Sequence, residues 1–126
     1  MRYNTKMECA RYLNDVYGKN VFNNIVRQKN LEKGYDERVL SIIRKEYDIF
    51  FENMYNNIEL EYSSEKIQNL IKEFDIFIDL VYSNSKEVLK IYANIFLSEE
   101  AYIKKFNSYD NKLGDYIVEA IKYYIN

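Results

Sequence analysis

Histidine, proline and tryptophan are all absent from the sequence, and cysteine occurs once, at position 9. Without histidine, the chain cannot build a haem site with a proximal histidine, a histidine-based catalytic triad or a histidine metal site. The single thiol of Cys9 cannot form an intramolecular disulfide, so the cysteine content does not favour an oxidising compartment. An isolated cysteine on a helix is most often a small buried apolar side chain, and we expect that role for Cys9.

Long apolar runs and dense clusters of like charge are also missing. The most apolar run, FDIFIDLVY, contains two aspartates and is a poor candidate for a membrane span, and no signal peptide is recognisable. The net charge is -2 and the lysines are scattered, so there is no basic stripe for nucleic-acid phosphates. We expect a cytoplasmic protein that binds no membrane and, by itself, no nucleic acid.

Tyrosine, by contrast, is in excess, with 14 residues in a chain of 126. One explanation is compositional, because abundant Asn, Ile, Lys and Tyr is typical of an AT-rich genome. The other is a stacking surface for a ligand, since tyrosine combines a flat apolar face with a polar tip. The length suits one domain over residues 1–126, and no linker, repeat or low-complexity tract divides it.

Apolar residues recur at helical spacing along the chain, which predicts an all-α fold of about six to seven helices. The first helix lies within residues 4–20, begins at a capping box formed by Thr5 and Glu8, and ends at Gly18. A second, short helix lies within 20–28. The predicted apolar faces contain Met7, Ala10, Leu13 or Asn14, and Tyr17 in the first helix, and Val21, Phe22, Ile25 and Val26 in the second.

A polar loop containing Gly34 ends at Asp36, which can cap a long helix over residues 37–60. The apolar face of this helix contains Val39, Ile42, Ile43, Tyr47, Phe50, Met54 and Ile58. Phe51 and Tyr55 lie beside this face and widen it. A wide aromatic stripe indicates either a helix buried between two layers or a helix whose Phe51 or Tyr55 lines a groove, and both interpretations stay open.

The remaining helices are predicted over residues 63–85, 86–96, 99–106 and 113–125. Asn84 and Glu87 indicate a capping box between the first two of these helices, and Ser98 indicates the cap of the third. The predicted buried faces of the first and the last contain Ile67, Leu70, Ile71, Phe74, Phe77, Ile78 and Val81, and Leu113, Tyr116, Ile117, Ala120, Ile121 and Tyr124.

Paired carboxylates occur at Glu59 and Glu61 and at Glu99 and Glu100. Catalysis by such a pair requires a shielded pocket and shifted pKa values, whereas these segments have a solvent-facing pattern. A solvated surface, or a favourable charge near a helix N-terminus, is the simpler explanation. We therefore expect no catalytic residue, no metal site and no cofactor, and a protein that is not an enzyme.

The order of several residues after position 64 is also a family resemblance. These residues are Tyr82, Ser85 and Glu87, then Tyr92 and Ala93, and then Leu113, Gly114, Ala120, Ile121 and Tyr123. In this order they resemble the TipAS domain, the antibiotic-recognition domain usually found behind a MerR-type DNA-binding half. The resemblance continues less closely in Glu8, Ala10, Tyr17, Gly18, Asn20 and Phe22, where Tyr17 replaces a typical Trp and Asn20 a typical Thr.

The resemblance implies a globin-like helical domain that holds thiopeptides or other bulky antibiotics in a cleft between helices. It also implies that residues 1–34 are mobile without ligand and that residues 35–126 form the helical core. The residues that we expect to bind the ligand either match the family pattern or flank predicted helix breaks, and they are Tyr17, Phe22, Tyr82, Asn84, Tyr92, Phe96, Phe106, Leu113 and Tyr116. For Phe96, Leu113 and Tyr116 a role in the core is the stronger interpretation. Some family members carry a reactive cysteine where this chain has Asn84, so covalent capture is not expected.

The expected function is reversible, non-enzymatic binding of a bulky thiopeptide-like or multi-ring antibiotic on tyrosine and phenylalanine faces. Such a chain standing alone would sequester the drug and confer resistance, whereas the same domain in a longer regulator would sense it. No helix-turn-helix and no heptad-repeat helix for dimerisation is recognisable, so we expect a monomer. The alternative is a helical protein interaction module that has kept the fold and lost the pocket.

Overall fold

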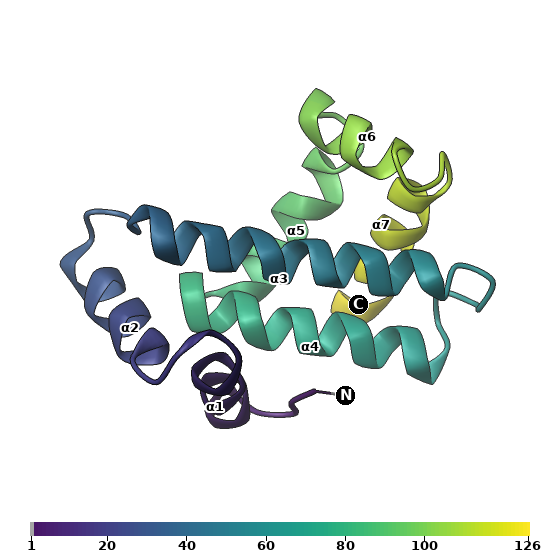
Figure 1. Cartoon of the computed structure of the whole chain (residues 1–126). Coiled ribbons are helices and arrows are strands. Elements are labelled where there is room, and N and C mark those ends of the chain that lie inside the picture. Colours follow the sequence, from purple (N-terminus) through teal and green to yellow (C-terminus); the bar gives the residue numbers. More distant parts are fainter. Residues whose placement is uncertain (1) are drawn as a thin grey trace.

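The computed structural model describes residues 2–126 and, within that range, contains seven α-helices and no strand (Figure 1). The predicted all-helical class is therefore confirmed. The helices are α1 (Lys6–Tyr17), α2 (Val21–Leu31), α3 (Glu37–Asn56), α4 (Glu65–Tyr82), α5 (Ser85–Ile95), α6 (Glu100–Asn107) and α7 (Leu113–Ile125). Not one of these seven is both long enough and apolar enough to cross a membrane.

The two longest helices, α3 and α4, form the centre of the molecule. They pack side by side and are joined by a turn at one end, so they run in opposite directions (Figure 1). Helices α1 and α2 pack on each other and on α4. Helices α5 and α7 also pack on α4 and on each other, and α6 packs on α7. Helix α4 therefore connects the N-terminal pair of helices to the C-terminal three.

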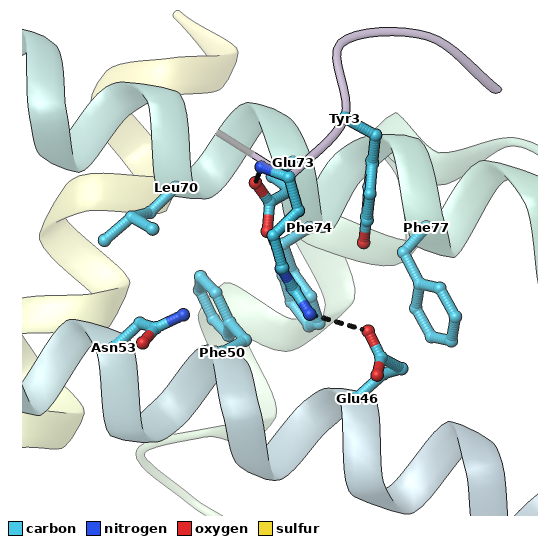
Figure 2. Close-up of a pocket in the computed structure, with 9 residues that line it drawn as sticks. Tyr3, Glu46, Phe50, Asn53, Leu70, Glu73, Phe74 and Phe77 are labelled. Carbon is cyan, nitrogen blue, oxygen red and sulfur yellow. Dashed lines mark hydrogen bonds and ion pairs between the residues drawn. The ribbon is translucent and has the colours of Figure 1, made fainter. Parts of the chain in front are cut away.

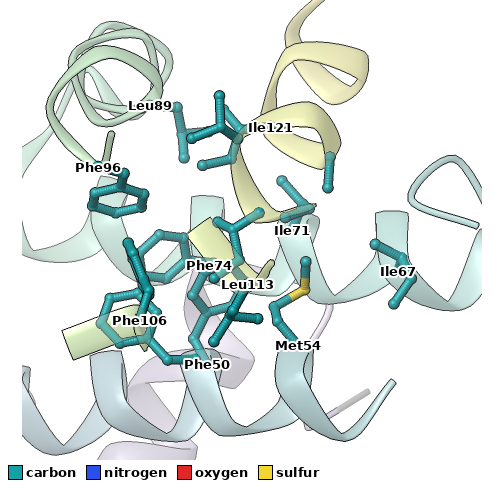
Figure 3. Packing of buried hydrophobic residues seen from close by; sticks show 14 of the residues in the cluster. Phe50, Met54, Ile67, Ile71, Phe74, Leu89, Phe96, Phe106, Leu113 and Ile121 are labelled. Atoms are coloured by element: carbon teal, nitrogen blue, oxygen red, sulfur yellow. The ribbon is translucent and has the colours of Figure 1, made fainter. Parts of the chain in front are cut away.

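Apolar side chains form two buried clusters, and the half-buried Tyr47 packs against both. The C-terminal cluster joins α3 and α4 to α5, α6 and α7 and contains Phe50, Phe74, Phe96 and Phe106 (Figure 3). The rings of Phe50 and Phe74 stack with their centroids 3.9 Å apart. The N-terminal cluster contains Tyr3, Cys9, Ala10, Leu13, Val21, Ile25, Val39, Ile42, Ile43, Phe77, Leu80 and Val81. Most of the apolar faces predicted for α3, α4 and α7 are buried in these two clusters.

The buried face of α1 contains Ala10 and Leu13, as predicted, but it also contains Cys9 and excludes Met7. The side chain of Met7, which the prediction placed on the apolar face, is 74% exposed, whereas Cys9 is fully buried. Cys9 and Leu13 are four residues apart and so lie on one side of the helix, which is the side that packs into the N-terminal cluster. The expected role of Cys9 as a small buried side chain is confirmed, and burial raises the pKa of its thiol to about 12.

Two predicted helix starts and one predicted helix end are confirmed. The backbone N–H of Glu8 donates to Thr5 Oγ1 at 3.1 Å, and the backbone N–H of Val39 donates to Asp36 Oδ1 at 2.9 Å. Each side chain thus satisfies one of the amides that a helix N-terminus leaves without a partner. Gly18 ends α1 with a φ of 125°, a conformation that residues with a side chain rarely adopt.

Asn84 is the N-cap residue of α5, as predicted, but the side-chain bond expected of it is absent, and the predicted cap at Ser98 is wrong because Glu99 is the N-cap of α6. Asn84 has a left-handed backbone with a φ of 48°, and its side chain makes no cap hydrogen bond. The backbone N–H of Ser85 instead donates to Asp79 Oδ1 at 3.3 Å, so a carboxylate in the preceding helix takes the capping role. Ser98 Oγ donates to the Asn94 carbonyl at 3.1 Å. It therefore satisfies a carbonyl at the end of α5 and does not cap the N-terminus of α6.

The Asp79 carboxylate also pairs with Lys6 Nζ of α1 at 2.9 Å, and the hydrogen bond from Lys6 lowers the pKa of Asp79. A lowered pKa in the folded state contributes stability above the ordinary aspartate pKa of about 3.9, and this contribution is lost as the pH falls below that value. Asp79→Asn is therefore expected to lower the free energy of unfolding by up to about 1 kcal/mol at pH 7, because the pair is partly exposed. The loss should be smaller at pH 3.

Urea unfolding of the wild type and of Asp79→Asn, each at pH 7 and at pH 3, measures how the loss of stability depends on pH. Asp15→Asn removes an exposed carboxylate from α1 and serves as the control, for which we expect little change at either pH. An equal loss for Asp79→Asn at pH 7 and pH 3 would contradict the proposed ionic contribution.

Candidate functional site

An open groove with a volume of about 400 Å³ lies between α3, α5 and α6, next to the end of α4. We call it the aromatic groove. Its lining residues are Leu40, Ile43, Arg44, Tyr47, Asp48, Phe51, Tyr82, Tyr92, Ala101, Tyr102 and Lys105. The α3 residues recur every three or four positions, so they share one face of that helix. This face shares Ile43 and Tyr47 with the predicted apolar stripe and Phe51 with its predicted widening, whereas Tyr55 lies outside the groove lining.

Tyrosine rings form the interior of the aromatic groove. The ring of Tyr47 meets the edge of Tyr92 with the centroids 5.9 Å apart, and Tyr92 stacks on the buried Phe96 at 4.8 Å. Tyr102 packs beside Tyr92 with the centroids 6.3 Å apart. The groove is thus continuous with the C-terminal cluster, which holds these rings in place.

Charged side chains lie at the rim of the aromatic groove. Lys105 Nζ of α6 pairs with Asp48 Oδ1 of α3 at 2.8 Å, and Arg44 pairs with Glu37 at 3.2 Å. These groups are between 40% and 82% exposed, so each pair contributes little to stability. The Lys105–Asp48 pair nevertheless joins the two sides of the groove.

Tyr82 stands at the C-terminal end of α4 and is 44% exposed. Its ring packs edge-on against Tyr35 with the centroids 6.2 Å apart, and the Tyr35 hydroxyl donates to the Val81 carbonyl. Tyr82 also lines a neighbouring depression of about 260 Å³, which contains Tyr35. The ring of Tyr82 therefore separates the aromatic groove from this second depression.

Burial keeps the groove phenols protonated. It raises the pKa of Tyr92 to about 12 and raises the pKa of Tyr47, Tyr82 and Tyr102 above the ordinary tyrosine value. At neutral pH these groups are neutral hydroxyls, which can donate and accept hydrogen bonds, and not phenolate bases. Together with the ring faces, they suit the groove to stacking and hydrogen bonding of an aromatic molecule.

Tyr82 and Tyr92 are the predicted ligand-binding residues that the structure brings together in the aromatic groove. Tyr17 lies elsewhere, and its hydroxyl donates to Glu46 Oε2 at 2.5 Å. Phe22 lines a separate apolar depression of about 370 Å³ between α1, α2 and α4. Asn84 is exposed in the α4–α5 turn.

The other predicted ligand-binding residues belong to the interior. Phe96, Phe106 and Leu113 are at most 1% exposed and are members of the C-terminal cluster. Tyr116 is half-buried, and its hydroxyl lies 3.0 and 2.7 Å from the carbonyls of Asn57 and Leu60, which ties α7 to the turn after α3. None of these four residues lines the aromatic groove, although Phe96 and Phe106 pack behind its tyrosines, against Tyr92 and Tyr102.

Sequence reasoning did not select Tyr47, Tyr102 or the charged rim. Tyr47 lay on the predicted apolar stripe, so its hydroxyl gave no separate signal. Phe51, which could have lined a groove or been buried, does both: it is 3% exposed and lines the groove floor. The sequence feature that could have indicated this groove was the width of the apolar stripe on α3.

A cluster of buried charges lies on the other side of α3 and α4 (Figure 2). Glu46 and Glu73 are 2% and 3% exposed and face each other across the two helices. Arg2, from the segment before α1, bridges them with Nε 2.6 Å from Glu73 and Nη1 3.0 Å from Glu46. Hydroxyls of Tyr12 and Tyr17 donate to the same Glu46 carboxylate.

The space beside this ionic cluster has a volume of about 10 Å³, which is room for about one water molecule. It cannot hold a ligand, and both carboxylates are already paired. The cluster therefore joins the segment before α1 to α3 and α4. Within residues 2–126, no group of three or more acidic or cysteine side chains is placed to bind a metal ion.

The sequence was also compared with known protein families, curated proteins and solved structures. The sequence model of a family described as "TipAS antibiotic-recognition domain" matches residues 10–124, which is nearly the whole chain. The corresponding comparisons with curated proteins and with solved structures found no match.

Proposed function

Since this chain belongs to the family of TipAS antibiotic-recognition domains, we propose that its aromatic groove reversibly binds bulky multi-ring or thiopeptide-like antibiotics. The observation that carries this proposal is the clustering of Tyr47, Tyr82, Tyr92 and Tyr102 around one open space of about 400 Å³. That volume is within the range of small-molecule sites, which are mostly apolar with a few polar groups that orient the ligand. The groove has this composition.

The proposed binding is non-covalent and non-enzymatic. The thiol of Cys9 is fully buried in the N-terminal cluster and lies outside the groove lining, so it cannot trap a ligand there. Affinity then comes from burial of aromatic area, with hydroxyl contacts that set orientation. Binding by this domain alone would lower the free drug concentration. In a domain joined to a DNA-binding half, the same binding would act as the sensor.

Tyr82→Ala is expected to weaken or abolish antibiotic binding while the protein stays folded, because Tyr82 is 44% exposed and its ring lines the groove. Thermal unfolding against a panel of thiopeptides and albicidin-like multi-ring antibiotics measures this. Ligand binding to the folded state raises stability by about 2.7 kcal/mol at a hundredfold excess over the Kd, and the unfolding midpoint rises accordingly. We expect this rise in the wild type and a smaller rise or none in Tyr82→Ala.

Tyr123→Ala is the matched control, because Tyr123 is 54% exposed on α7 and does not line the groove. It should keep the full ligand-induced rise. If no compound in the panel shifts the midpoint of the well-folded wild type, the antibiotic-binding proposal fails and a protein interaction module becomes the better explanation. An equal rise in Tyr82→Ala and the wild type would place the binding site outside the aromatic groove.

A further inference from the structure

Four tyrosines line the aromatic groove. Their hydroxyls provide more O–H hydrogen-bond donors than the protein provides acceptors for. The hydroxyls of Tyr47 and Tyr92 lie 2.5 Å apart and share one hydrogen bond. Whichever of the two donates, the proton of the other has no acceptor among residues 2–126. The hydroxyls of Tyr82 and Tyr102 make no hydrogen bond to another residue within this range, and water can reach them because Tyr82 is 44% exposed and Tyr102 is half-buried.

These four phenols lie close enough to influence one another. The pKa of Tyr47 is raised first by burial and then by the nearby Tyr92, Tyr82 and Tyr102. The pKa of Tyr92 is raised mainly by burial; the hydrogen bond with Tyr47 lowers it, and Tyr102 and Tyr82 raise it to a lesser degree. A proton is therefore hard to remove from any of them, and at neutral pH the groove presents O–H donors and no phenolate.

The rest of the lining does not supply matching acceptors. Leu40, Ile43, Phe51 and Ala101 are apolar. The one carboxylate of the lining, Asp48, is paired with Lys105 at the rim. In the open groove, water can accept the unused phenol protons. A flat ligand that covers the rings displaces that water, and an unpaired buried donor costs about 1–3 kcal/mol.

We propose that the four-tyrosine donor cluster selects neutral multi-ring ligands whose covered faces or edges carry hydrogen-bond acceptors, such as ring nitrogens or amide carbonyls. This inference rests on the proposed function and specifies its ligand class. An all-carbon ring system of the same shape is disfavoured, because it leaves the phenol donors unpaired. Because one phenol already accepts from its neighbour in the Tyr47–Tyr92 pair, its own O–H is polarised and is the stronger donor.

A matched pair of small probes tests this inference. Quinoline and naphthalene have the same two-ring shape, and only quinoline has a ring nitrogen that accepts a hydrogen bond. The quinoline-to-naphthalene affinity ratio is measured for each protein and then compared between proteins. The difference in hydration between the two probes is the same for every protein and therefore cancels. Titrations followed by ¹H–¹⁵N NMR spectra give the affinities and show whether the shifted amides belong to the groove. The test variant carries the four changes Tyr47→Phe, Tyr82→Phe, Tyr92→Phe and Tyr102→Phe.

The preference for quinoline over naphthalene is expected to fall about three- to tenfold in the test variant, which corresponds to the loss of one neutral hydrogen bond. The single changes Tyr47→Phe and Tyr92→Phe should each keep most of the preference, since either hydroxyl left alone can still donate. The control variant removes the same number of hydroxyls from tyrosines outside the groove by Tyr55→Phe, Tyr62→Phe, Tyr109→Phe and Tyr123→Phe. The control should keep the wild-type ratio.

An unchanged ratio in a folded test variant whose groove still binds both probes would overturn the inference. If the antibiotics of the panel bind the wild type and the ratio does not respond, this inference fails and the proposed function stands. If neither the antibiotics nor the probes bind the wild-type groove, both fail.

Discussion

Arg2→Met is expected to lower the free energy of unfolding by about 2–4 kcal/mol, because it leaves Glu46 and Glu73 buried without their cation. Arg2 makes both ion pairs, at 3.0 and 2.6 Å, and its backbone N–H also donates to Glu73 at 2.8 Å. Breaking one partner of a fully buried pair typically costs 3–5 kcal/mol. The Arg2 side chain is 27% exposed, so water can partly replace it, and the expected loss is correspondingly smaller.

Urea unfolding at pH 7 measures this loss, with Arg11→Met as the control, since Arg11 is exposed on α1. Adding Glu46→Gln and Glu73→Gln to the Arg2→Met protein should recover a large part of the stability. The recovery is expected because these changes remove the uncompensated buried charges. A loss below about 1 kcal/mol for Arg2→Met, similar to that of the control, would show that the segment before α1 adds little to the folded state.

Phe96→Ala is expected to destabilise the protein by about 3–5 kcal/mol, because it removes a large side chain from the C-terminal cluster. Phe96 is fully buried, and its ring contacts Tyr92, Tyr102 and Phe106 at centroid distances of 4.8, 4.7 and 5.1 Å. The surrounding helices cannot fill the resulting cavity completely. Denaturant unfolding measures the loss.

The neighbouring Leu97 is 43% exposed, so Leu97→Ala is the matched control and should cost less than about 1 kcal/mol. This comparison also tests the ligand-binding role predicted for Phe96, which flanks a predicted helix break. If Phe96→Ala keeps its stability and loses only antibiotic binding, the side chain belongs to the ligand site and not to the core.

Helical periodicity was sufficient to predict the elements of this fold, because each long helix buries one regular apolar stripe. It could not predict the buried polar residues within those stripes. Glu46 and Glu73 are tolerated in the interior because Arg2 pairs with them, and Arg2 lies 44 and 71 positions away in the sequence. Local capping rules failed for a similar reason at Asn84, where Asp79 supplies the cap from the preceding helix.

The candidate site was predictable only in part. Tyr82 and Tyr92 match the family pattern and lie in the aromatic groove, but the convergence of Tyr47 and Tyr102 on them depends on how α3 and α6 pack. Phe106 and Leu113 also match the family pattern or flank helix breaks, and such positions include residues that hold the fold together. The mobility of residues 1–34 without ligand stays a prediction.

Helix α6 supplies one wall of the aromatic groove, although it has only eight residues and no side-chain cap at its N-terminus. A helix of this length has little stability of its own and is held by Phe106 in the core and by the Lys105–Asp48 pair. Its amides can therefore exchange with solvent through local openings that leave α3 and α4 folded. A ligand that bridges α3 and α6 must restrict these openings, at a cost in conformational entropy. Any change that stiffens α6 should accordingly increase affinity without adding a contact to the ligand.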